Sequence, residues 1–200
     1  FYALPFFGLL GILAGLLSVY LTRNVIYFKG LFNSFSREYM RVIGGSVIIS
    51  TAIFCFPALY GEGYFAVSGL LSGTGFIDLT VLLTLLAILL LKPVVTAITL
   101  GAGGDGGVFA PSLFLGAFLG YFLAMVLNHY FHAEVIPVNF MVIGMAAMLS
   151  GSIHAPFTSI FLVCAMVGNY QLFIPVVIAS FIAKFTARLI LPYSVYSFGR

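Results

Sequence analysis

The stretch Gly101–Pro111 (GAGGDGGVFAP) separates two long apolar runs and carries five glycines in its first seven residues. Glycine tolerates positive φ, so successive backbone N–H groups can converge in such a loop. A helix that starts at the end of the loop presents its first N–H groups, and the positive end of its dipole, to whatever lies there. In a membrane, this loop therefore predicts an anion site that needs no Lys or Arg.

The composition places this loop inside a membrane. Hydrophobic residues make up 62% of the 200 residues, charged residues 6%, and the mean hydropathy is +1.21, whereas a soluble domain carries about 25% charged residues. We therefore predict an all-α integral membrane protein without a soluble domain. The net charge of +3 is too small and too dispersed to indicate nucleic-acid binding. Cys55 and Cys164 lie in apolar runs and are expected to be small core residues, not a disulfide.

Apolar runs of two lengths alternate along the chain. Long runs lie at Leu4–Tyr20, Val42–Leu59, Leu79–Leu100, Val108–Leu127 and Leu172–Leu191, and short runs at Phe65–Leu71, Phe140–Leu149 and Phe157–Val167. Full spans mixed with half-length helices and Gly/Pro breaks are typical of channels and transporters. Basic residues gather in a polar interval from Arg23 to Arg41 and again from Lys184 to Arg200, which predicts that both segments face the cytoplasm. We expect residues 1–200 to be part of one transmembrane domain of a longer protein.

The glycine-rich loop also matches a dinucleotide-binding fingerprint, because Gly101, Gly103 and Gly106 follow the pattern G-x-G-x-x-G. That fingerprint needs a short strand before it and an acidic residue about 20 positions on. The chain has a long apolar run before the loop and no acid at that distance after it. No Lys-Ser/Thr pair follows the last glycine, which excludes a P-loop. A plain tight turn would not need so many glycines, nor Pro111 in the first turn of the next helix.

A second break, Gly151–Pro156 (GSIHAP), contains Ser152 and His154. This pair raises a remote alternative, an intramembrane serine hydrolase. No further residue of a catalytic type lies in an apolar run to complete such a site. We therefore expect His154 at a helix end and predict that the protein is not an enzyme.

Other polar residues carry weaker signals. His129, His132 and Glu134 could supply metal ligands, but loop residues of this kind are usually solvated, so we predict no metal and no cofactor. Lys92 lies within an apolar run, where a charge is a functional candidate by default. Pairing within the protein, or snorkelling to the surface, explains Lys92 equally well.

Four motifs in order along the chain resemble one family. GGVFAPSLFLGAFLG at Gly106–Gly120 resembles the GxFxP signature of the CLC chloride channels and chloride/proton exchangers. HAPFTSIFLV at His154–Val163, GNYQLFIP at Gly168–Pro175 and SVYS at Ser194–Ser197 are similar to later motifs of that family, and YGEGY at Tyr60–Tyr64 agrees with its position before a short helix. The resemblance covers essentially all 200 residues.

The resemblance implies an architecture. The CLC fold is an inverted-repeat bundle of tilted full-length and half-length helices, and two subunits form a homodimer with one pore each. This chain resembles the last helix of the first repeat, from Leu4–Tyr20, followed by the second repeat. The implied dimer contact uses residues 4–20 and 157–191, although a lipid-facing surface would explain their apolar character equally well.

The resemblance also implies a chloride site. The family's central chloride is held by backbone N–H groups after the GxFxP glycine and by hydroxyl groups, which map here onto Gly107, Val108, Phe109 and the hydroxyl of Tyr196. Tyr193, three positions earlier, is the runner-up for the hydroxyl. Neutral donors bind an anion firmly enough to dehydrate it, yet weakly enough to release it. The surrounding pore loop is expected to comprise Gly103, Gly104, Asp105, Gly106 and Pro111.

The implied function is transmembrane chloride transport, with chloride/proton exchange favoured by the bacterial character of YGEGY and GNYQLFIP and with a bacterial inner membrane as the location. A passive chloride channel and a fluoride-selective relative are the alternatives. The family's gating glutamate and serine ligand belong to first-repeat motifs, which this chain does not contain. Asp105 stands where the family often has a small residue, and it could repel chloride or simply face water. Ala165 stands where the family often has a glutamate.

Overall fold

The structure is a computed structural model that describes residues 4–35, 37–59, 79–104, 106–168 and 170–197. Every regular element in this described part is helical, as the composition predicts. The elements are α1 (Leu4–Asn33), α2 (Glu38–Cys55), the 3-10 turn η1 (Pro57–Leu59), α4 (Leu79–Gly101), α5 (Phe109–Phe131), α6 (Pro137–Ile153), α7 (Pro156–Val167) and α8 (Phe173–Ile190).

Helix lengths confirm the predicted alternation of long and short segments. Among the described residues, α1, α2, α4, α5 and α8 are long and apolar enough to cross a membrane. Helices α6 and α7, of 17 and 12 residues, are apolar but shorter. The short run predicted at Phe65–Leu71 lies outside the described residues, as does the YGEGY motif.

The polar interval predicted after Tyr20 is largely helix. Helix α1 continues to Asn33, because Arg23 and Lys29 lie on its exposed side while Val25 and Phe32 remain buried on the other. Charged side chains on one face leave the backbone hydrogen bonds of a helix intact, so an apolar run shows only the minimum length of such a helix.

The second predicted break is also shorter than its sequence indicates. Helix α6 runs through Gly151 and ends at Ile153, with His154 as its left-handed C-cap. Gly151 is needed for packing rather than for a turn, because a Cβ at this position would collide with Oγ of Ser18 on α1. The observed break is therefore confined to the residues between Ile153 and Pro156.

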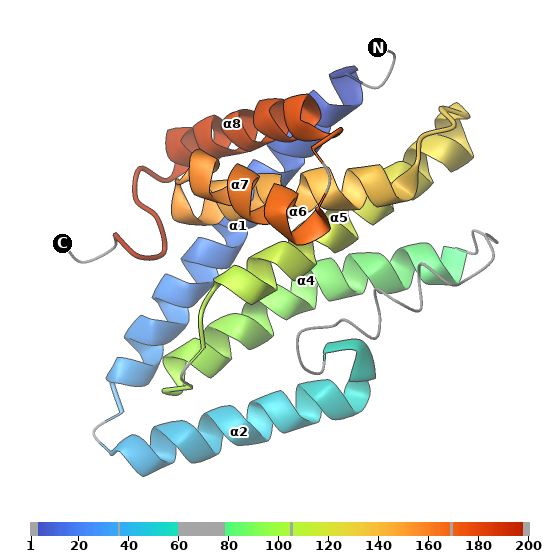
Figure 1. Cartoon of the computed structure of the whole chain (residues 1–200). Coiled ribbons are helices and arrows are strands. Elements are labelled where there is room, and N and C mark those ends of the chain that lie inside the picture. The colour runs from blue at the N-terminus through green and yellow to red at the C-terminus, as the bar shows by residue number, and fades with distance from the viewer. Residues whose placement is uncertain (1–3, 36, 60–78, 105, 169, 198–200) are drawn as a thin grey trace.

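Helices α5 and α6 lie side by side in the middle of the bundle (Figure 1). Helices α1 and α8 pack on α6 and on each other, α7 packs on α6 and α8, and α4 packs on α1 and α5. Phe118 of α5 and Phe140 of α6 are among the largest fully buried side chains of the core. This arrangement holds the start of α5 rigidly between the rest of the bundle and α4.

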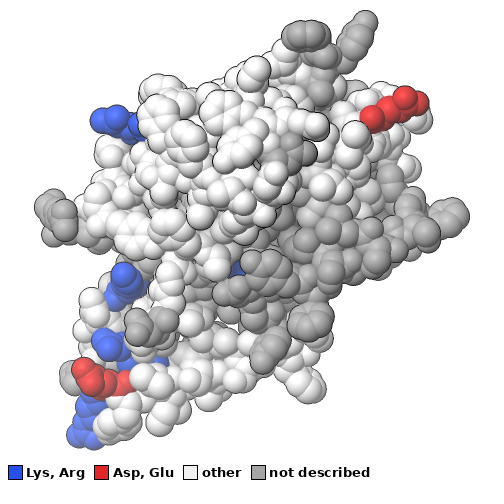
Figure 2. Space-filling model, viewed as in Figure 1, with Lys and Arg blue, Asp and Glu red and all other residues white. Residues whose placement is uncertain are grey.

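Helix α2 lies at the edge of the molecule (Figure 1) and contacts α4 and η1. Figure 2 shows that the charged side chains on the viewed face gather mostly where α1 ends and α2 begins, while the broad surface over α6 and α7 carries almost none. A broad surface with so few charges is suited to lipid or to another protein surface.

Candidate anion site at the start of α5

Helix α5 begins without a cap. Val108 occupies the N-cap position with a right-handed helical backbone, and no side chain caps the helix. Within the described part of the chain, no carbonyl accepts a hydrogen bond from the N–H of Gly107, Val108 or Phe109. The side chain of Val108 is buried, whereas Gly107 and Phe109 are exposed. The start of α5 therefore presents free N–H donors and the positive end of a helix dipole to an open face.

The loop that leads to this helix is held by its own backbone. The N–H of Gly104 donates to the carbonyl of Thr99 over 2.9 Å, and the N–H of Gly106 donates to the carbonyl of Gly104 over 3.0 Å. Gly103 has φ of 99°, a conformation that strongly favours glycine. The predicted pore-loop residue Asp105 lies outside the described residues.

The structure places Tyr196, and not Tyr193, beside this helix end. The hydroxyl of Tyr196 lies 3.9 Å from the position that a Cβ would occupy on Gly107, and its ring centroid lies 6.3 Å from that of Phe109. Tyr193 instead packs against Val19 of α1 and its neighbours on α8. The hydroxyl of Tyr196 and the N–H groups of the α5 start therefore face the same space.

A buried polar chain connects the start of α5 to the segment that carries Tyr196. The hydroxyl of Ser112, in the first turns of α5, donates to Oγ of Ser152 over 3.1 Å, and Ser152 Oγ donates to the carbonyl of Met148 over 2.8 Å. The carbonyl of Ser152 in turn accepts a hydrogen bond of 3.4 Å from the N–H of Val195. Ser152 thus joins α5, α6 and the C-terminal segment.

This arrangement gives Ser152 a structural role, which counts against the hydrolase alternative. The hydroxyl proton of Ser152 is directed at a backbone carbonyl, and its oxygen accepts a bond from another serine. His154 is a helix C-cap between α6 and α7, outside the membrane-length helices that the described residues form. Burial, together with the positive charges of Arg188 and Lys184, lowers the pKa of His154.

Lys92 is paired within the protein rather than extended to the surface. Its side chain is 5% exposed, and its ammonium group donates a 2.7 Å hydrogen bond to the carbonyl of Leu59 in η1. The same ammonium lies 5.2 Å from the ring centroid of Phe114 on α5. Lys92 therefore links α4 to both η1 and α5.

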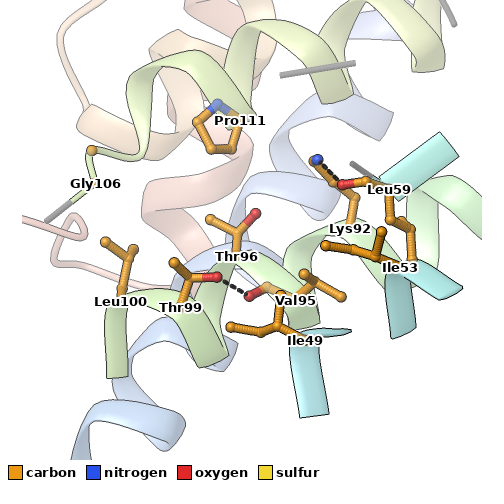
Figure 3. A pocket seen from close by; sticks show the side chains of 11 residues that line it. Ile49, Ile53, Leu59, Lys92, Val95, Thr96, Thr99, Leu100, Gly106 and Pro111 are labelled. Atoms are coloured by element: carbon orange, nitrogen blue, oxygen red, sulfur yellow. Dashed lines mark hydrogen bonds between the residues drawn. The ribbon is translucent and has the colours of Figure 1, made fainter. Parts of the chain in front are cut away.

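A cavity of about 290 Å³ lies between Lys92 and the glycine loop (Figure 3). Its lining comes from α2, η1, α4, the end of the loop and Pro111 in the first turn of α5. The predicted loop residues Gly106, Gly107 and Pro111 are thus brought together at one end of the cavity, and Lys92 lies in its wall.

Arg41 is a neighbour of the loop that the sequence analysis missed. Its Nη2 atom lies 3.6 Å from the position of a Cβ on Gly103, and its Nε atom is buried without a hydrogen-bond partner in the described structure. In the sequence, Arg41 is one of several basic residues in the polar interval, and no local pattern connects it with a loop about sixty residues later. The structure adds a fixed positive charge to the loop's surroundings.

Of the histidines predicted in a polar loop, His132 lies in the compact turn between α5 and α6, but His129 lies in the last turn of α5, because the helix continues to Phe131. His132 and Glu134 have left-handed backbone conformations, with φ of 47° and 49°. Asn128 closes the turn, because its side chain donates to the carbonyl of Val135 over 2.9 Å and accepts from the N–H of Val135 over 2.8 Å. Among the described residues, no group of three or more His, Cys, Asp or Glu side chains is placed to hold a metal ion.

Comparison with known proteins identifies the family. A family model described as "Voltage gated chloride channel" matches residues 1–188. The chain belongs to the voltage-gated chloride channel (CLC) family. Together with the five membrane-length helices among the described residues, this makes it an integral membrane protein. The resemblance of the GGVFAP, HAPFT and NYQ motifs to CLC motifs is therefore confirmed at the level of the family.

Curated relatives of the chain carry chloride-channel names. It is 32% identical over 161 residues to a putative chloride channel protein ClcB-like of Ralstonia nicotianae, an alignment that covers 80% of this chain and 36% of that protein. It is 31% identical over 196 residues to the voltage-gated ClC-type chloride channel ClcB of an Escherichia coli strain, covering 93% of this chain and 44% of that protein. The chain thus spans less than half the length of these relatives.

Solved structures show the same fold. A CLC-type fluoride/proton antiporter superposes with a TM-score of 0.78 at 20% identity, covering 98% of this chain and 46% of that one. A slow cyanobacterial Cl⁻/H⁺ antiporter superposes with a TM-score of 0.77 at 22% identity, covering 97% and 45% of the two chains. The predicted CLC-type bundle of full-length and half-length helices is therefore confirmed.

Proposed function

We propose that this protein moves chloride across a membrane in exchange for protons, with the anion held at the start of α5. The observation that carries the proposal is the uncapped N-terminus of α5, whose free N–H groups face the hydroxyl of Tyr196. Two structures with this fold are titled proton antiporters, which supports exchange over passive flow.

The proposed site uses neutral donors only. The N–H groups of Val108 and Phe109, next to Gly107, and the Tyr196 hydroxyl would replace part of the hydration shell of a chloride ion. The dipole of α5 adds positive potential without a full charge at the point of contact. Such a site binds an anion and still releases it, which transport requires.

Two other modes of transport use the same site. The ClcB relatives are named channels, which favours a passive chloride channel, and one structural neighbour is titled a fluoride/proton antiporter, which favours a fluoride-selective transporter. In liposomes with an imposed chloride gradient, proton movement against its own gradient indicates exchange. Chloride flux without proton movement indicates a channel, and fluoride flux without chloride flux indicates the fluoride alternative.

The proposal extends to the setting of the transporter, for which membership of the family is the support. Residues 1–200 are part of one transmembrane domain, with the N-terminal helix as the last of a first repeat and the remainder as a second repeat. A homodimer forms through residues 4–20 and 157–191, whose exposed side chains include Leu9, Phe161 and Leu189. The protein lies in a bacterial inner membrane, a location supported by its ClcB relatives from bacteria. It acts as a transporter rather than an enzyme and uses no cofactor.

The deciding experiment removes the tyrosine hydroxyl. Tyr196→Phe in the full-length protein keeps the ring beside Phe109 and should weaken chloride binding about tenfold, because one donor to a charged ligand is lost. Tyr193→Phe is the matched control and should bind chloride as the unmodified protein does. Calorimetric titration with chloride measures both. Equal binding by Tyr196→Phe and the unmodified protein would contradict the proposed site.

A further inference from the structure

An apolar groove of about 440 Å³ lies between α2 and α4. Val47 and Ile48 on its rim are 61% and 49% exposed, so the groove opens at the surface of the molecule. Among the described residues that line it, Thr51 carries the one hydroxyl, which already donates to the carbonyl of Val47 over 2.8 Å. Walls of this kind suit an apolar chain, because a polar ligand would lose its hydration without gaining new hydrogen bonds.

A basic corner lies beyond one end of this groove, where α1 ends and α2 begins (Figure 2). Residues 23–41 carry four basic side chains, and Glu38 is the one acid among them. Lys29 and Arg37 are exposed, and Arg41 is half-buried. The net charge of the basic corner is therefore positive, and it attracts an anionic group.

Arg41 lies on the same face of α2 as the groove. Residues spaced by three or four positions share one face of a helix, and on α2 such a line consists of Arg41, Gly45, Ile49 and Ala52. Ile49 and Ala52 line the groove. The guanidinium of Arg41 lies beside Gly103, just after the end of α4, with Nη2 3.6 Å from the position of a Cβ. The groove between α2 and α4 is therefore directed towards this guanidinium.

The lengths of the groove and of its charged end match those of a lipid leaflet. The lining residues of α2 extend from Val47 to Phe56, about 14 Å at 1.5 Å per residue. One leaflet contributes about 15 Å to the hydrocarbon core of a bilayer. Arg41 lies about 9 Å before Val47 along the helix, so its long side chain can reach the headgroup layer.

We infer that the groove binds an acyl chain of an anionic phospholipid, whose headgroup lies at the basic corner. The apolar walls account for the chain and the positive charge accounts for the headgroup, and an anionic lipid combines the two in one molecule. The bound chain supplies contacts that the described part of the protein does not give α2, of whose apolar window only 6% is buried. The lipid thus fastens α2 to α4. This inference goes beyond the proposed function and does not depend on which ion is transported.

The test uses the full-length protein in lipid vesicles, with a single tryptophan as a fluorescent reporter. The 200 residues contain no tryptophan, and any elsewhere in the full-length protein is replaced by phenylalanine. Phe56→Trp places the reporter in the groove, at the end away from Arg41. Phe54→Trp is the matched control, because Phe54 is 87% exposed and does not line the groove. Phospholipids brominated near the ends of their acyl chains quench a tryptophan that they touch.

The vesicles consist of phosphatidylcholine with increasing amounts of a brominated lipid. Phe56→Trp should be half-quenched by brominated phosphatidylglycerol, which is anionic, at a mole fraction about fivefold lower than by brominated phosphatidylcholine, the factor for one basic side chain at a membrane surface. Phe54→Trp should show no such preference. Adding Arg41→Gln to Phe56→Trp should abolish the preference, and Arg41→Lys should keep it. Arg188→Gln, at an exposed residue of α8, should leave it unchanged.

Every other outcome overturns the inference. Equal quenching of Phe56→Trp by the two lipids would mean that the headgroup is not selected, and no quenching by either would mean that another part of the protein covers the groove. Loss of the preference in Arg188→Gln as well as in Arg41→Gln would mean that overall charge attracts the lipid. If Arg41→Gln does not fold, Ala52→Leu decides, because it fills the groove and should reduce quenching by both lipids. Ser50→Leu, at an exposed residue outside the groove, is its control, and equal quenching in these two variants would place the chain elsewhere.

Discussion

Helices α5 and α2 are both long enough to cross a membrane, yet the bundle surrounds one and barely touches the other. In α5, 61% of the apolar window is buried inside the structure, whereas in α2 the share is 6%. Gly45 is the buried residue of α2 among those described. Hydropathy alone separates these helices poorly, because lipid and protein interior are similarly apolar.

The difference comes from small residues at the helix contacts. Added Cβ atoms at Gly116 and Gly120 of α5 would collide with the backbone carbonyls of Gly144 and Phe140 on α6. In lipid, where apolar burial does not drive helices together, such close backbone approach gives extensive van der Waals contact. On α2, Gly44 has nothing within 4 Å of its Cβ position. The tight pair α5–α6 therefore supports the anion site, and α2 adds one wall to the cavity.

The sharpest test of this comparison places the same side chain in both regions. Gly120→Leu should destabilise the full-length protein by about 3 kcal/mol or more, because α5 and α6 must separate to admit it. Gly44→Leu, the matched control on α2, should change stability by less than about 0.5 kcal/mol. Unfolding in mixed detergent micelles measures both. Similar values for the two variants would break the comparison.

A smaller loss of stability is expected when the hydrogen bond between Ser112 of α5 and Ser152 of α6 is removed. Ser152→Ala should cost about 1 to 3 kcal/mol, because the buried hydroxyl of Ser112 loses its acceptor. The double variant Ser112→Ala/Ser152→Ala removes both groups and should regain part of that loss. The same unfolding assay measures this cycle. Strict additivity of the two single changes would show that the pair is not coupled.

The contact of α2 with the end of α4 should tolerate change better. Gly45→Leu would collide with the side chain of Ala102, but α2 can move outward because, in the described part of the chain, it packs mainly on α4 and η1. We expect a loss of about 1 kcal/mol. The shift should also enlarge the cavity next to Ile49 and Ile53 of α2, which a crystal structure of the variant would show. A loss as large as that of Gly120→Leu would mean that α2 is fixed as firmly as α5.

The smallest effect concerns the outer face of α2. Phe54 is 87% exposed, so Phe54→Ala should change the stability of the full-length protein by less than about 0.5 kcal/mol if lipid covers it. Phe118→Ala, at a fully buried phenylalanine of α5, is the reference and should cost about 3 to 5 kcal/mol. If Phe54→Ala approached the reference value, the rest of the protein, and not lipid, would cover α2.

Much of the fold could be predicted because its signals are local. The apolar runs located the helices, and the glycine-rich stretch located the uncapped start of α5 at Phe109. The predicted helix ends were less accurate than the predicted positions, since α1 continues to Asn33 through a segment with charged side chains on one face. The resemblance of the motifs identified the family. It also favoured Tyr196 as the chloride-binding hydroxyl with Tyr193 as the runner-up, but only the structure shows which of the two lies beside the start of α5.

The sequence by itself determined that this chain lies in a membrane, that its helices have two lengths, and that a glycine-rich turn exposes backbone donors at the start of α5. Only the tertiary structure decided that Tyr196 lies beside Gly107, that Lys92 bonds to Leu59, and that Ser152 links α5 to the C-terminal segment. The physical reason is the distance along the sequence between the residues that interact. Helix formation and turn chemistry depend on residues a few positions apart, whereas these contacts join segments that only helix packing brings together.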